Sequence, residues 1–440
     1  MRRILSQREK AAIIEINKRL DLELPAFKLT KRRIFIDRLL FDEKLRADIR
    51  TFCEDNKLFY EEAMKRVEDY IREIVPSFNA YVYFKLGNWL SKKISRFLYR
   101  VRVGFTDEQG LEKINPYSSI VFIMNHRSNL DYILLGYLSF QRVALSFAVG
   151  EWARVWPLKP LISAMGAFFV RRGSKNSLYR LVLARYVQLA TQGGMVQAVY
   201  PEGRLSRDGR LGTPRLGLLD YMLRTYNPEE DRDIVFIPVG INYDRVLEDR
   251  TLLLEGEAGV KQKSLLGIIY IILRYIGRSF WLRARGGWHR FGYAIVNFGT
   301  PISMKEYTHK HEVSFRTLDK AQRIERVTRL ANVLMEAAGK IVPVAPVPLI
   351  SCVFAENPEK SFSDFEIAAR VQDLIKRLEK HSAHIYIPRQ NWTYAINVGL
   401  RMLTLRHIVS VEDNLYRAAP EEIKILRYYA NSIHHLLHPY

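Results

Sequence analysis

Cysteine is almost absent from this sequence. Only Cys53 and Cys352 occur among its 440 residues. Two cysteines so far apart exclude a disulfide framework, a CxxC redox pair and a cysteine-based zinc cluster. We therefore expect a protein of a reducing compartment that holds no metal.

Repeats and leader segments are missing as well. There is no Gly-X-Y period, no repeat of about 20–50 residues and no low-complexity tract, which excludes collagen-like and solenoid architectures. The basic start MRRILSQREKAA is not followed by an apolar stretch, so we expect no signal peptide. The hydrophobic content of 48% is typical of globular proteins, and at about 150 residues per domain the length predicts two or three domains.

Acidic residues are missing from two long windows of a chain whose net charge is +21. The windows 74–106 and 258–305 contain six and eight basic residues and no acid, so they carry two thirds of that charge. Such surfaces indicate an anionic partner, which could be a nucleic acid, a membrane surface or a phosphorylated ligand. The sequence shows no helix-turn-helix, zinc-finger or RNP-type pattern, so nucleic acid is the least favoured of the three.

Each window contains a basic amphipathic segment. Over residues 82–101 apolar side chains, including Trp89 and Phe97, recur at helical spacing, and the basic residues fall mostly on the other side. The segment Ser264–Arg285 is more apolar, but its uninterrupted apolar run Leu265–Leu273 is about half of the ~20 residues that a spanning helix needs. Both patterns predict helices that lie in the lipid interface. The alternative is that both pack on the protein's own core.

Short apolar runs alternate with helical patterns from about residue 118 onward. This alternation predicts an α/β fold, with a mixed or parallel sheet that is covered by helices and ends near Tyr293–Gly299. Helical patterns dominate on either side of this region. We therefore expect an N-terminal helical region (1–105, with the basic helix at about 82–101), an α/β core (106–311) and a mostly helical C-terminal domain (312–440). Within the last of these, Pro343–Ile350 reads as a Pro-rich link.

His126 directly follows a predicted strand, and Asp131 lies in the first turn of the next predicted helix. An imidazole held by a carboxylate is the usual arrangement of a general base, and the carboxyl edge of an α/β sheet is where ligands bind. The alternative is a surface histidine and an aspartate that merely stabilises a helix N-terminus.

Three further segments carry polar groups at predicted strand ends. Gly166–Arg172 ends in Arg171 and Arg172, whose paired guanidinia suit a phosphate or a carboxylate. Tyr200–Arg210 follows another strand and contains Glu202, a carboxylate that can accept from hydroxyls. Gly203 permits close backbone approach to a ligand. Three groups of this segment suit a phosphate: Arg204, Ser206 and Arg207. Ile234–Tyr243 is a fourth apolar strand, in which Pro238 indicates a sheet edge or a bend, or simply core.

Together these four segments resemble the four motif blocks of the glycerolipid acyltransferases. The resemblance is closest to the membrane-bound bacterial glycerol-3-phosphate acyltransferases and extends over residues 50–440, including RDGRLGTPRLGLLDYM, YAIVNFGTPISMKEY and LRYYANSIHHLL. The third block usually reads E-G-G/T-R-S, whereas here it reads E-G-R-L-S, so the arginine that holds phosphate is either Arg204 or Arg207. The long N-terminal extension of the enterobacterial-type enzymes is not found in this sequence, and we expect any regulation located there to be absent.

The resemblance implies acyl transfer from an acyl thioester, acyl-CoA or acyl carrier protein, to the 1-hydroxyl of sn-glycerol 3-phosphate. His126 is then the general base and Asp131 its orienting partner. Arg171, Arg172 and the arginines after Gly203 bind the phosphate, with Arg172 favoured over Arg171. Glu202 and Ser206 position the glycerol hydroxyls, and Pro238 borders the acyl-donor path.

No cofactor and no metal is implied by the resemblance, and the protein is expected at the cytoplasmic face of the inner membrane as a peripheral protein. Lysophosphatidate and dihydroxyacetone phosphate stay open as alternative acceptors. A non-catalytic protein that binds membrane surfaces is the alternative from another class, but it leaves the His126–Asp131 pair without a role.

Overall fold

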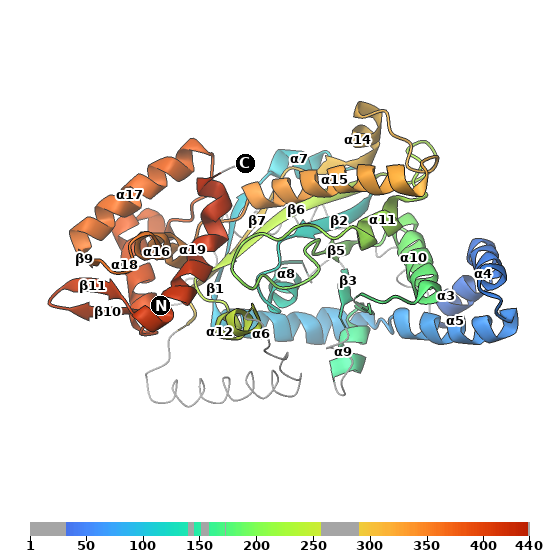
Figure 1. Ribbon diagram of the computed structural model, residues 1–440, viewed down its shortest axis with the longest axis horizontal. Coiled ribbons are helices and arrows are strands. Elements are labelled where there is room, and N and C mark those ends of the chain that lie inside the picture. Colours follow the sequence, from blue (N-terminus) through green and yellow to red (C-terminus); the bar gives the residue numbers. More distant parts are fainter. Residues whose placement is uncertain (1–31, 140–144, 151–157, 172, 257–289, 439–440) are drawn as a thin grey trace.

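The computed structural model describes residues 32–139, 145–150, 158–171, 173–256 and 290–438. Three groups of elements follow one another along the long axis of the molecule (Figure 1): N-terminal helices, a central sheet with its covering helices, and a C-terminal group. The N-terminal helices are α3 (Arg32–Leu40), α4 (Glu43–Asn56) and α5 (Tyr60–Ile74).

The central sheet is mixed and mostly parallel. Its strands lie in the order β1-β7-β6-β2-β5-β3-β4, with β8 beside β6, and only the pairs β6–β7 and β6–β8 are antiparallel. The strands are β1 (Arg100–Thr106), β2 (Ser119–Met124), β3 (Ser146–Val149), β4 (Phe168–Phe169), β5 (Gln197–Val199), β6 (Ile234–Tyr243), β7 (Tyr293–Phe298) and β8 (Ile302–Ser303). The predicted fold class, an α/β sheet covered by helices, is confirmed.

Both faces of this sheet are covered. Strands β2, β6 and β7 are buried at every position, as expected for mostly parallel strands between two helical layers. Because side chains alternate along a strand, Ile120 and Phe122 of β2 join one hydrophobic cluster while Val121 and Ile123 join the other. The near-continuous apolar runs of the sequence therefore fill two cores rather than one.

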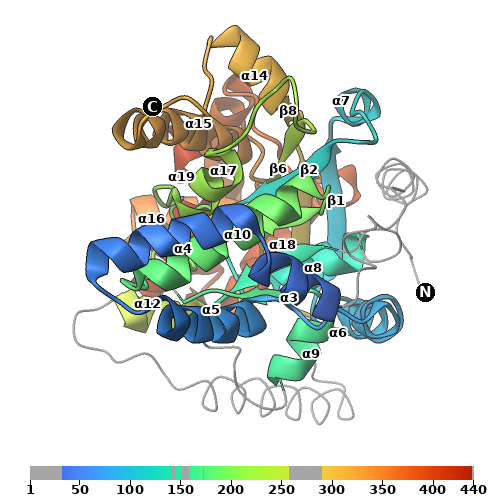
Figure 2. The same cartoon turned by 90° about the vertical axis from the view of Figure 1, so that its right-hand side faces the viewer.

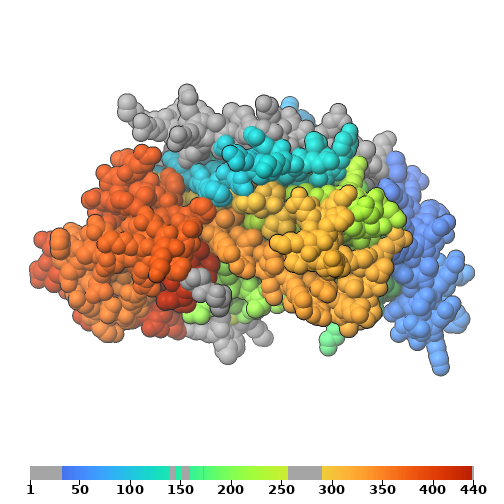
Figure 3. All heavy atoms as spheres, turned by 90° about the horizontal axis from the view of Figure 1, so that it is seen from above, coloured from blue at the N-terminus to red at the C-terminus, as the bar shows by residue number. Residues whose placement is uncertain are grey.

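Each core has its own set of helices. The N-terminal helices, α10 (Ser177–Gln192), α11 (Gly217–Leu223) and α15 (Lys320–Lys340) pack on one face. Figure 2 shows α4 and α5 beside α10, and Figure 3 shows the segment that contains α14 and α15 covering the molecule from above. α6 (Asn88–Leu98), α8 (Asp131–Ser139) and the C-terminal group pack on the other face. The remaining short helices are α7 (Glu108–Glu112), α9 (Leu158–Ala164), α12 (Asp249–Gly256) and α14 (Met304–Lys310).

The strand register brings distant parts of the sequence to the same edge of the sheet. Ile123 of β2 pairs with Val199 of β5 on one side and with Pro238 of β6 on the other. His126 and Glu202 each stand three residues beyond their paired strand positions, so they leave the sheet side by side. The chemistry-bearing segments of the sequence therefore meet at the carboxyl ends of β2 and β5.

The C-terminal group consists mostly of helices. α16 (Pro346–Glu356) is almost entirely buried and packs against α17 (Asp364–Lys380), α18 (Trp392–Thr404) and α19 (Ile423–Leu437). A small antiparallel sheet is formed by β10 (Val409–Glu412), β11 (Leu415–Ala418) and β9 (Ser361–Ser363), and two 3₁₀ turns cover Pro388–Gln390 and Pro420–Glu422. The expected Pro-rich link is wrong in its second half, because Pro346 and Pro348 lie in the first turn of α16, where no backbone N–H is needed.

Two elements lie across the domain limits expected from the sequence. β1 starts at Arg100, before the expected core limit of 106, and pairs with β7 in the central sheet. α15 lies within the expected C-terminal domain, but it packs on β6 and β2 of the central sheet. The division of the chain into domains therefore stays a prediction, but β1 and α15 both pack with the central sheet.

The basic helix predicted over residues 82–101 ends earlier than expected. A π-helical turn (Val82–Gly87) leads into α6, which ends at Leu98. Tyr99 is extended, and Arg100 and Val101 belong to β1, so the prediction is wrong for these last residues. Val101 fits the helical spacing by chance, and its burial comes from the sheet. The second basic segment, Ser264–Arg285, lies outside the described residues.

Among the helices that the structure describes, none has both the length and the apolar character that crossing a bilayer requires.

Candidate active site

His126 and Asp131 form a buried pair at the carboxyl end of β2. Nδ1 of His126 lies 2.9 Å from Oδ2 of Asp131, and the two residues are 2% and 0% exposed. The chain returns on itself between them, because the backbone N–H of Asp131 donates to the carbonyl of Ser128 before α8 begins. The predicted pairing of the two side chains is present, as a turn between strand and helix allows.

The turn from His126 to Asp131 is held by hydrogen bonds at all six of its backbone N–H groups. Oδ2 of Asp131 accepts from the N–H of Arg127 (2.8 Å) and of Ser128 (3.1 Å). The N–H of His126 donates to Glu202, that of Asn129 to Glu248, and that of Leu130 to the Ser128 hydroxyl. A loop whose donors are all satisfied has little freedom to move, so the imidazole stands on a rigid support.

Aromatic rings surround the imidazole. The His126 ring lies against Tyr200, with 4.1 Å between ring centroids, and the Tyr132 ring meets it edge-on at 5.6 Å. Nδ1 is used by Asp131, and among the described residues no group hydrogen-bonds Nε2. An aspartate that accepts from Nδ1 favours the tautomer in which Nε2 is unprotonated, so Nε2 is the atom that can take a proton from a substrate.

Glu202 lies in the site, but its contacts differ from the expected ones. One carboxylate oxygen accepts from the N–H of His126 at 2.9 Å and the other from the N–H of Gly212 at 2.8 Å. Burial raises the pKa of this carboxyl, and the two N–H donors oppose that shift. Glu202 therefore ties the histidine turn to the segment that follows β5. Ser206 is also engaged, since its hydroxyl donates to the carbonyl of Arg210 and its N–H to the carbonyl of His126.

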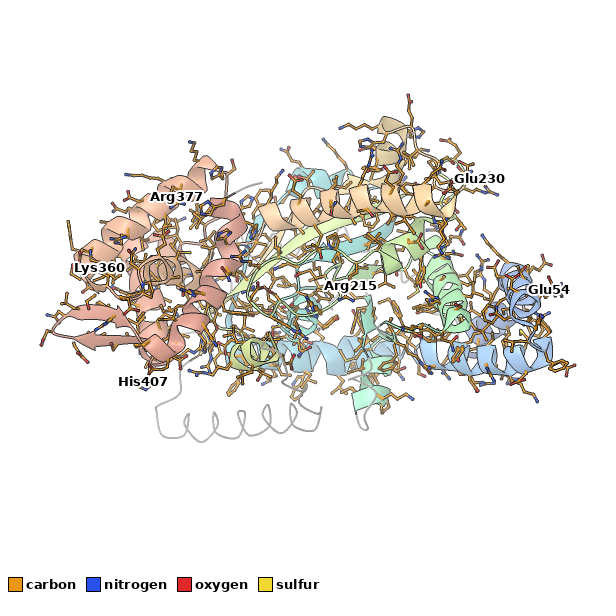
Figure 4. All side chains as sticks on the ribbon, viewed as in Figure 1. Glu54, Arg215, Glu230, Lys360, Arg377 and His407 are labelled. Atoms are coloured by element: carbon orange, nitrogen blue, oxygen red, sulfur yellow. The ribbon has the colours of Figure 1, made fainter. Side chains whose placement is uncertain are left out.

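Residues 203–215, here called the arginine loop, fold back around Glu202. The N–H of Arg215 donates to the carbonyl of Pro201, which closes the loop. Gly203 has φ +67°, and the Arg215 side chain packs so closely on it that an added Cβ would lie 2.7 Å from Cδ. The close approach expected at Gly203 is thus made by an arginine of the same loop. Figure 4 labels Arg215 near the middle of the molecule.

The arginine loop is rich in cations without acidic partners. Within the described residues, none of its arginines forms an ion pair with a carboxylate; these are Arg204, Arg207, Arg210 and Arg215. Arg204 is exposed and Arg207 half-buried. The loop that carries these four guanidinia contacts the histidine turn, since the N–H of Ser206 donates to the carbonyl of His126, and guanidinia without a carboxylate partner suit a phosphate.

The arginines after β4 are placed differently. Arg171 forms a two-pronged ion pair with Glu73 at 2.9 and 2.6 Å, between the rings of Tyr70 and Tyr179. Its guanidinium therefore already holds a carboxylate and joins α5 to the sheet, which supports a structural role. Arg172 lies outside the described residues.

Pro238 is buried inside β6, with β2 on one side. The expected sheet edge is wrong, because the other side of β6 pairs first with β8 at residues 235–236 and then with β7 at residues 239–243. Pro238 stands between these two partners, at a position where the ladder needs no N–H donor.

Three residues of the site were not expected from the sequence. Tyr243 donates its hydroxyl to Oδ1 of Asp131 at 2.6 Å. Glu248 accepts the Ser128 hydroxyl at 2.7 Å, and burial raises the pKa of this carboxyl to about 7. The Arg127 guanidinium donates to the carbonyl of Gly209 and lies 4.9 Å from the Tyr428 ring of α19. Their partners are far away in the sequence, so no local pattern indicates them.

A metal site requires several ligating side chains that lie close together. In the parts of the chain that the structure describes, no group of three or more histidine, cysteine, aspartate or glutamate side chains is arranged to hold an ion.

Two family models match this chain. The model "Acyltransferase" matches residues 106–242, which include the His126–Asp131 turn and the arginine loop, and the model "Glycerol-3-phosphate acyltransferase C-terminal region" matches residues 282–439. These matches confirm the family that the motifs indicated.

Curated relatives named glycerol-3-phosphate acyltransferase align with almost the whole chain. The Aeromonas hydrophila protein is 28% identical over 438 residues, which cover 93% of this chain and 50% of that protein. The Pseudomonas syringae pv. tomato protein is 27% identical over 422 residues, covering 93% and 49%. The chain spans about half the length of the curated relatives it matches.

A crystal structure of the 1-acyl-sn-glycerophosphate (LPA) acyltransferase from Thermotoga maritima aligns with a TM-score of 0.33 and 17% identity, over 69% of this chain and 97% of that one.

Proposed function

The chain belongs to the acyltransferase family and carries the C-terminal region of glycerol-3-phosphate acyltransferases, and from this premise we propose that it transfers an acyl group from an acyl thioester to the 1-hydroxyl of sn-glycerol 3-phosphate. The observation that carries the proposal is the buried 2.9 Å contact between His126 and Asp131 inside the matched acyltransferase segment. The product is lysophosphatidate, and the donor is acyl-CoA or acyl carrier protein.

The proposed reaction uses His126 as a general base. Nε2 removes the proton of the 1-hydroxyl as its oxygen attacks the thioester carbonyl, and Asp131 stabilises the imidazolium that forms. The tetrahedral intermediate then expels the thiolate, which takes the proton back from His126. An ester and a thiol leave, and the base is restored. No serine nucleophile is required, because the thioester is already activated.

The arginine loop is proposed to bind the substrate phosphate. Arg204 and Arg207 have no carboxylate partner among the described residues and lie between Glu202 and Gly212, whose N–H donates to Glu202. Arg171 is paired with Glu73, so the phosphate contact after β4 is assigned to Arg172. Glu202 and Ser206 already hydrogen-bond backbone groups, so we assign their contribution to the shape of the loop rather than to the glycerol hydroxyls.

The reaction is tested with the purified full chain, labelled sn-glycerol 3-phosphate and either acyl-CoA or carrier protein loaded with an acyl group. We expect 1-acyl lysophosphatidate with a free thiol released in equal amount. Parallel reactions with lysophosphatidate and dihydroxyacetone phosphate identify the acceptor. Turnover with lysophosphatidate alone would move the assignment to the next acylation, and a lack of turnover with every acceptor would leave a membrane-binding protein without this chemistry.

We also propose that the protein attaches peripherally to an anionic membrane, at the cytoplasmic face of the inner membrane, through the outer side of the π-helical turn and α6. The side of this segment that faces the protein buries three small residues, Gly87, Ser91 and Ser95, between the larger Tyr83 and Leu98. Its outer side exposes Trp89 (57%) and Leu86 (44%). A surface helix of a protein that stays in water usually turns its large apolar side chains inward, so the outward position of Trp89 and Leu86 needs a second apolar partner.

Basic residues accompany these apolar side chains on the outer side of the helix. Lys85, Lys92, Lys93 and Arg96 are exposed. No acid occurs from residue 74 to residue 106, so no neighbouring carboxylate in this window neutralises them. Trp and Leu at the headgroup level with cations around them are typical of helices that lie in the lipid interface.

Reversing two of these charges is expected to weaken vesicle binding strongly. A cation near an anionic leaflet contributes about 1 kcal/mol, so losing two lowers partitioning onto phosphatidylserine-containing vesicles about 30-fold, and Lys92→Glu with Lys93→Glu should lower it further because the new carboxylates are repelled. Co-sedimentation at low and physiological salt measures this. The matched control is Lys376→Glu with Lys380→Glu on α17, which lies away from α6 in Figure 1. Equal loss in both double variants would contradict docking through α6.

A further inference from the structure

Asp131 has two carboxylate oxygens with different partners. Oδ2 accepts three hydrogen bonds, from Nδ1 of His126 and from two backbone N–H groups. Oδ1 accepts one, from the hydroxyl of Tyr243 at 2.6 Å. Asp131 and Tyr243 are 0% and 1% exposed, so water does not replace this contact. The phenol is therefore the one donor to Oδ1 among the described residues, and it holds the side of the carboxylate that the backbone N–H groups leave free.

Tyr243 reaches Asp131 because β6 is longer than its neighbour β2. The last residue of β2, Met124, pairs with Val239, and β6 continues for four more residues to Tyr243. Val239, Ile241 and Tyr243 alternate along the strand and join the hydrophobic cluster that contains α8. The side chain of Asn125 holds the extension in place, since its amide bonds both the N–H and the carbonyl of Ile241.

The phenol itself is firmly held. Its ring lies against Tyr99, with 5.3 Å between centroids, and Tyr99 donates its hydroxyl to the carbonyl of Arg245. Burial first, and then the charge of Asp131, raises the pKa of Tyr243 well above its ordinary value, so the phenol keeps its proton and acts as the donor.

We propose that Tyr243 is a positioning residue for the acyl transfer: by holding Oδ1 of Asp131 it fixes the carboxylate, and through it the imidazole of His126. The inference rests on the proposed function, because it names a residue that supports the proposed base. Without the phenol, Oδ1 of the buried carboxylate has no donor and only the partners of Oδ2 hold the group, so the carboxylate can tilt and carry the imidazole out of line with the substrate. Tyr243 touches no reacting atom.

The test is Tyr243→Phe, which removes one hydroxyl and keeps the ring. We expect kcat to fall about tenfold, as for one lost hydrogen bond to a charged group, and KM for glycerol 3-phosphate to stay within twofold. The acid limb of the kcat/KM profile should move to higher pH, because a carboxylate without its phenol donor attracts the imidazolium more strongly. The other polar or charged groups around the pair are those of Tyr132, Tyr200, Glu202, Glu248 and Arg127.

Tyr429→Phe is the matched control. Tyr429 is fully buried and donates its hydroxyl to Oδ2 of Asp249 at the same distance of 2.6 Å, in a network with Arg406 rather than with the base. Its loss should lower the melting temperature while kcat and the pH profile stay as in the parent chain. A folded Tyr243→Phe variant with parental kcat and parental pH profile would overturn the inference.

The two proposals fail in different ways. Every variant is measured with the acceptor that the parent chain uses. If that acceptor is not glycerol 3-phosphate, the proposed function is revised, and the role of Tyr243 is still tested by kcat and the pH profile with the true acceptor. A parent chain without acyl transfer refutes both, since Tyr243 then supports no base.

Discussion

Replacing His126 with alanine is expected to lower the rate of acyl transfer about 10²–10⁴-fold, as removal of a positioned general base does. One nitrogen of this imidazole, Nδ1, lies 2.9 Å from the buried carboxylate of Asp131, and the other, Nε2, has no hydrogen-bond partner among the described residues. Because the side chain is buried and also contacts Asp131, Tyr132 and Tyr200, the fold of the variant is checked separately. Initial rates with saturating donor and acceptor measure the effect, and circular dichroism checks that the variant is folded.

Asp131→Asn should lose activity by a similar factor, and the double variant with His126→Ala should lose hardly more than either single one, because the two residues act as a unit. His309→Ala is a suitable control, since His309 is exposed on α14 and contacts Glu229 rather than the site. A folded His126→Ala chain with near-parental activity would exclude the proposed mechanism.

The second large effect is expected for Glu202→Gln. The two carboxylate oxygens accept the N–H groups of His126 and Gly212, whereas a glutamine offers one acceptor and one donor, so one of these N–H groups would face another donor. The turn that carries the base must shift to relieve this. A displacement of about 1 Å at a catalytic group can cost about 10²-fold, so kcat should fall by that factor while KM for glycerol 3-phosphate changes little.

Arg207→Ala provides the contrasting outcome. If the arginine loop binds the phosphate, this variant raises KM for glycerol 3-phosphate and leaves kcat closer to that of the parent chain. A Glu202→Gln variant that instead raises KM at unchanged kcat would return Glu202 to the role expected from the sequence, contact with the glycerol hydroxyls.

The sequence predicts those parts of the site that depend on local spacing. The apolar run of β2 ends one residue before Asn125, and the turn that follows is short enough to bring His126 and Asp131 together. Their contact could therefore be expected from six consecutive residues. The central sheet could be expected for the same reason, because each strand is a short apolar run that can be recognised without knowledge of the rest of the chain.

The errors and omissions concern partners that are distant along the chain. Arg171 is paired with Glu73, which is 98 residues away, and nothing near Arg171 indicates that partner. Tyr243 is 112 residues from Asp131, and only the register of β6 against β2 brings them together. Pro238 suggested a sheet edge because a proline lacks a donor, yet β6 changes partners at that point and needs none there.

The contact between α6 and α8 has a consequence for the path of the acyl chain. α8 begins with Asp131 and packs directly on α6. Packed helices have axes about 8–10 Å apart, so in the attachment proposed through α6 a single helix separates the bilayer from α8. At that distance a fatty chain can keep most of its length in the hydrocarbon while its thioester is cleaved. In the proposed reaction, the lysophosphatidate formed there would leave sideways into the leaflet without exposing its chain to water.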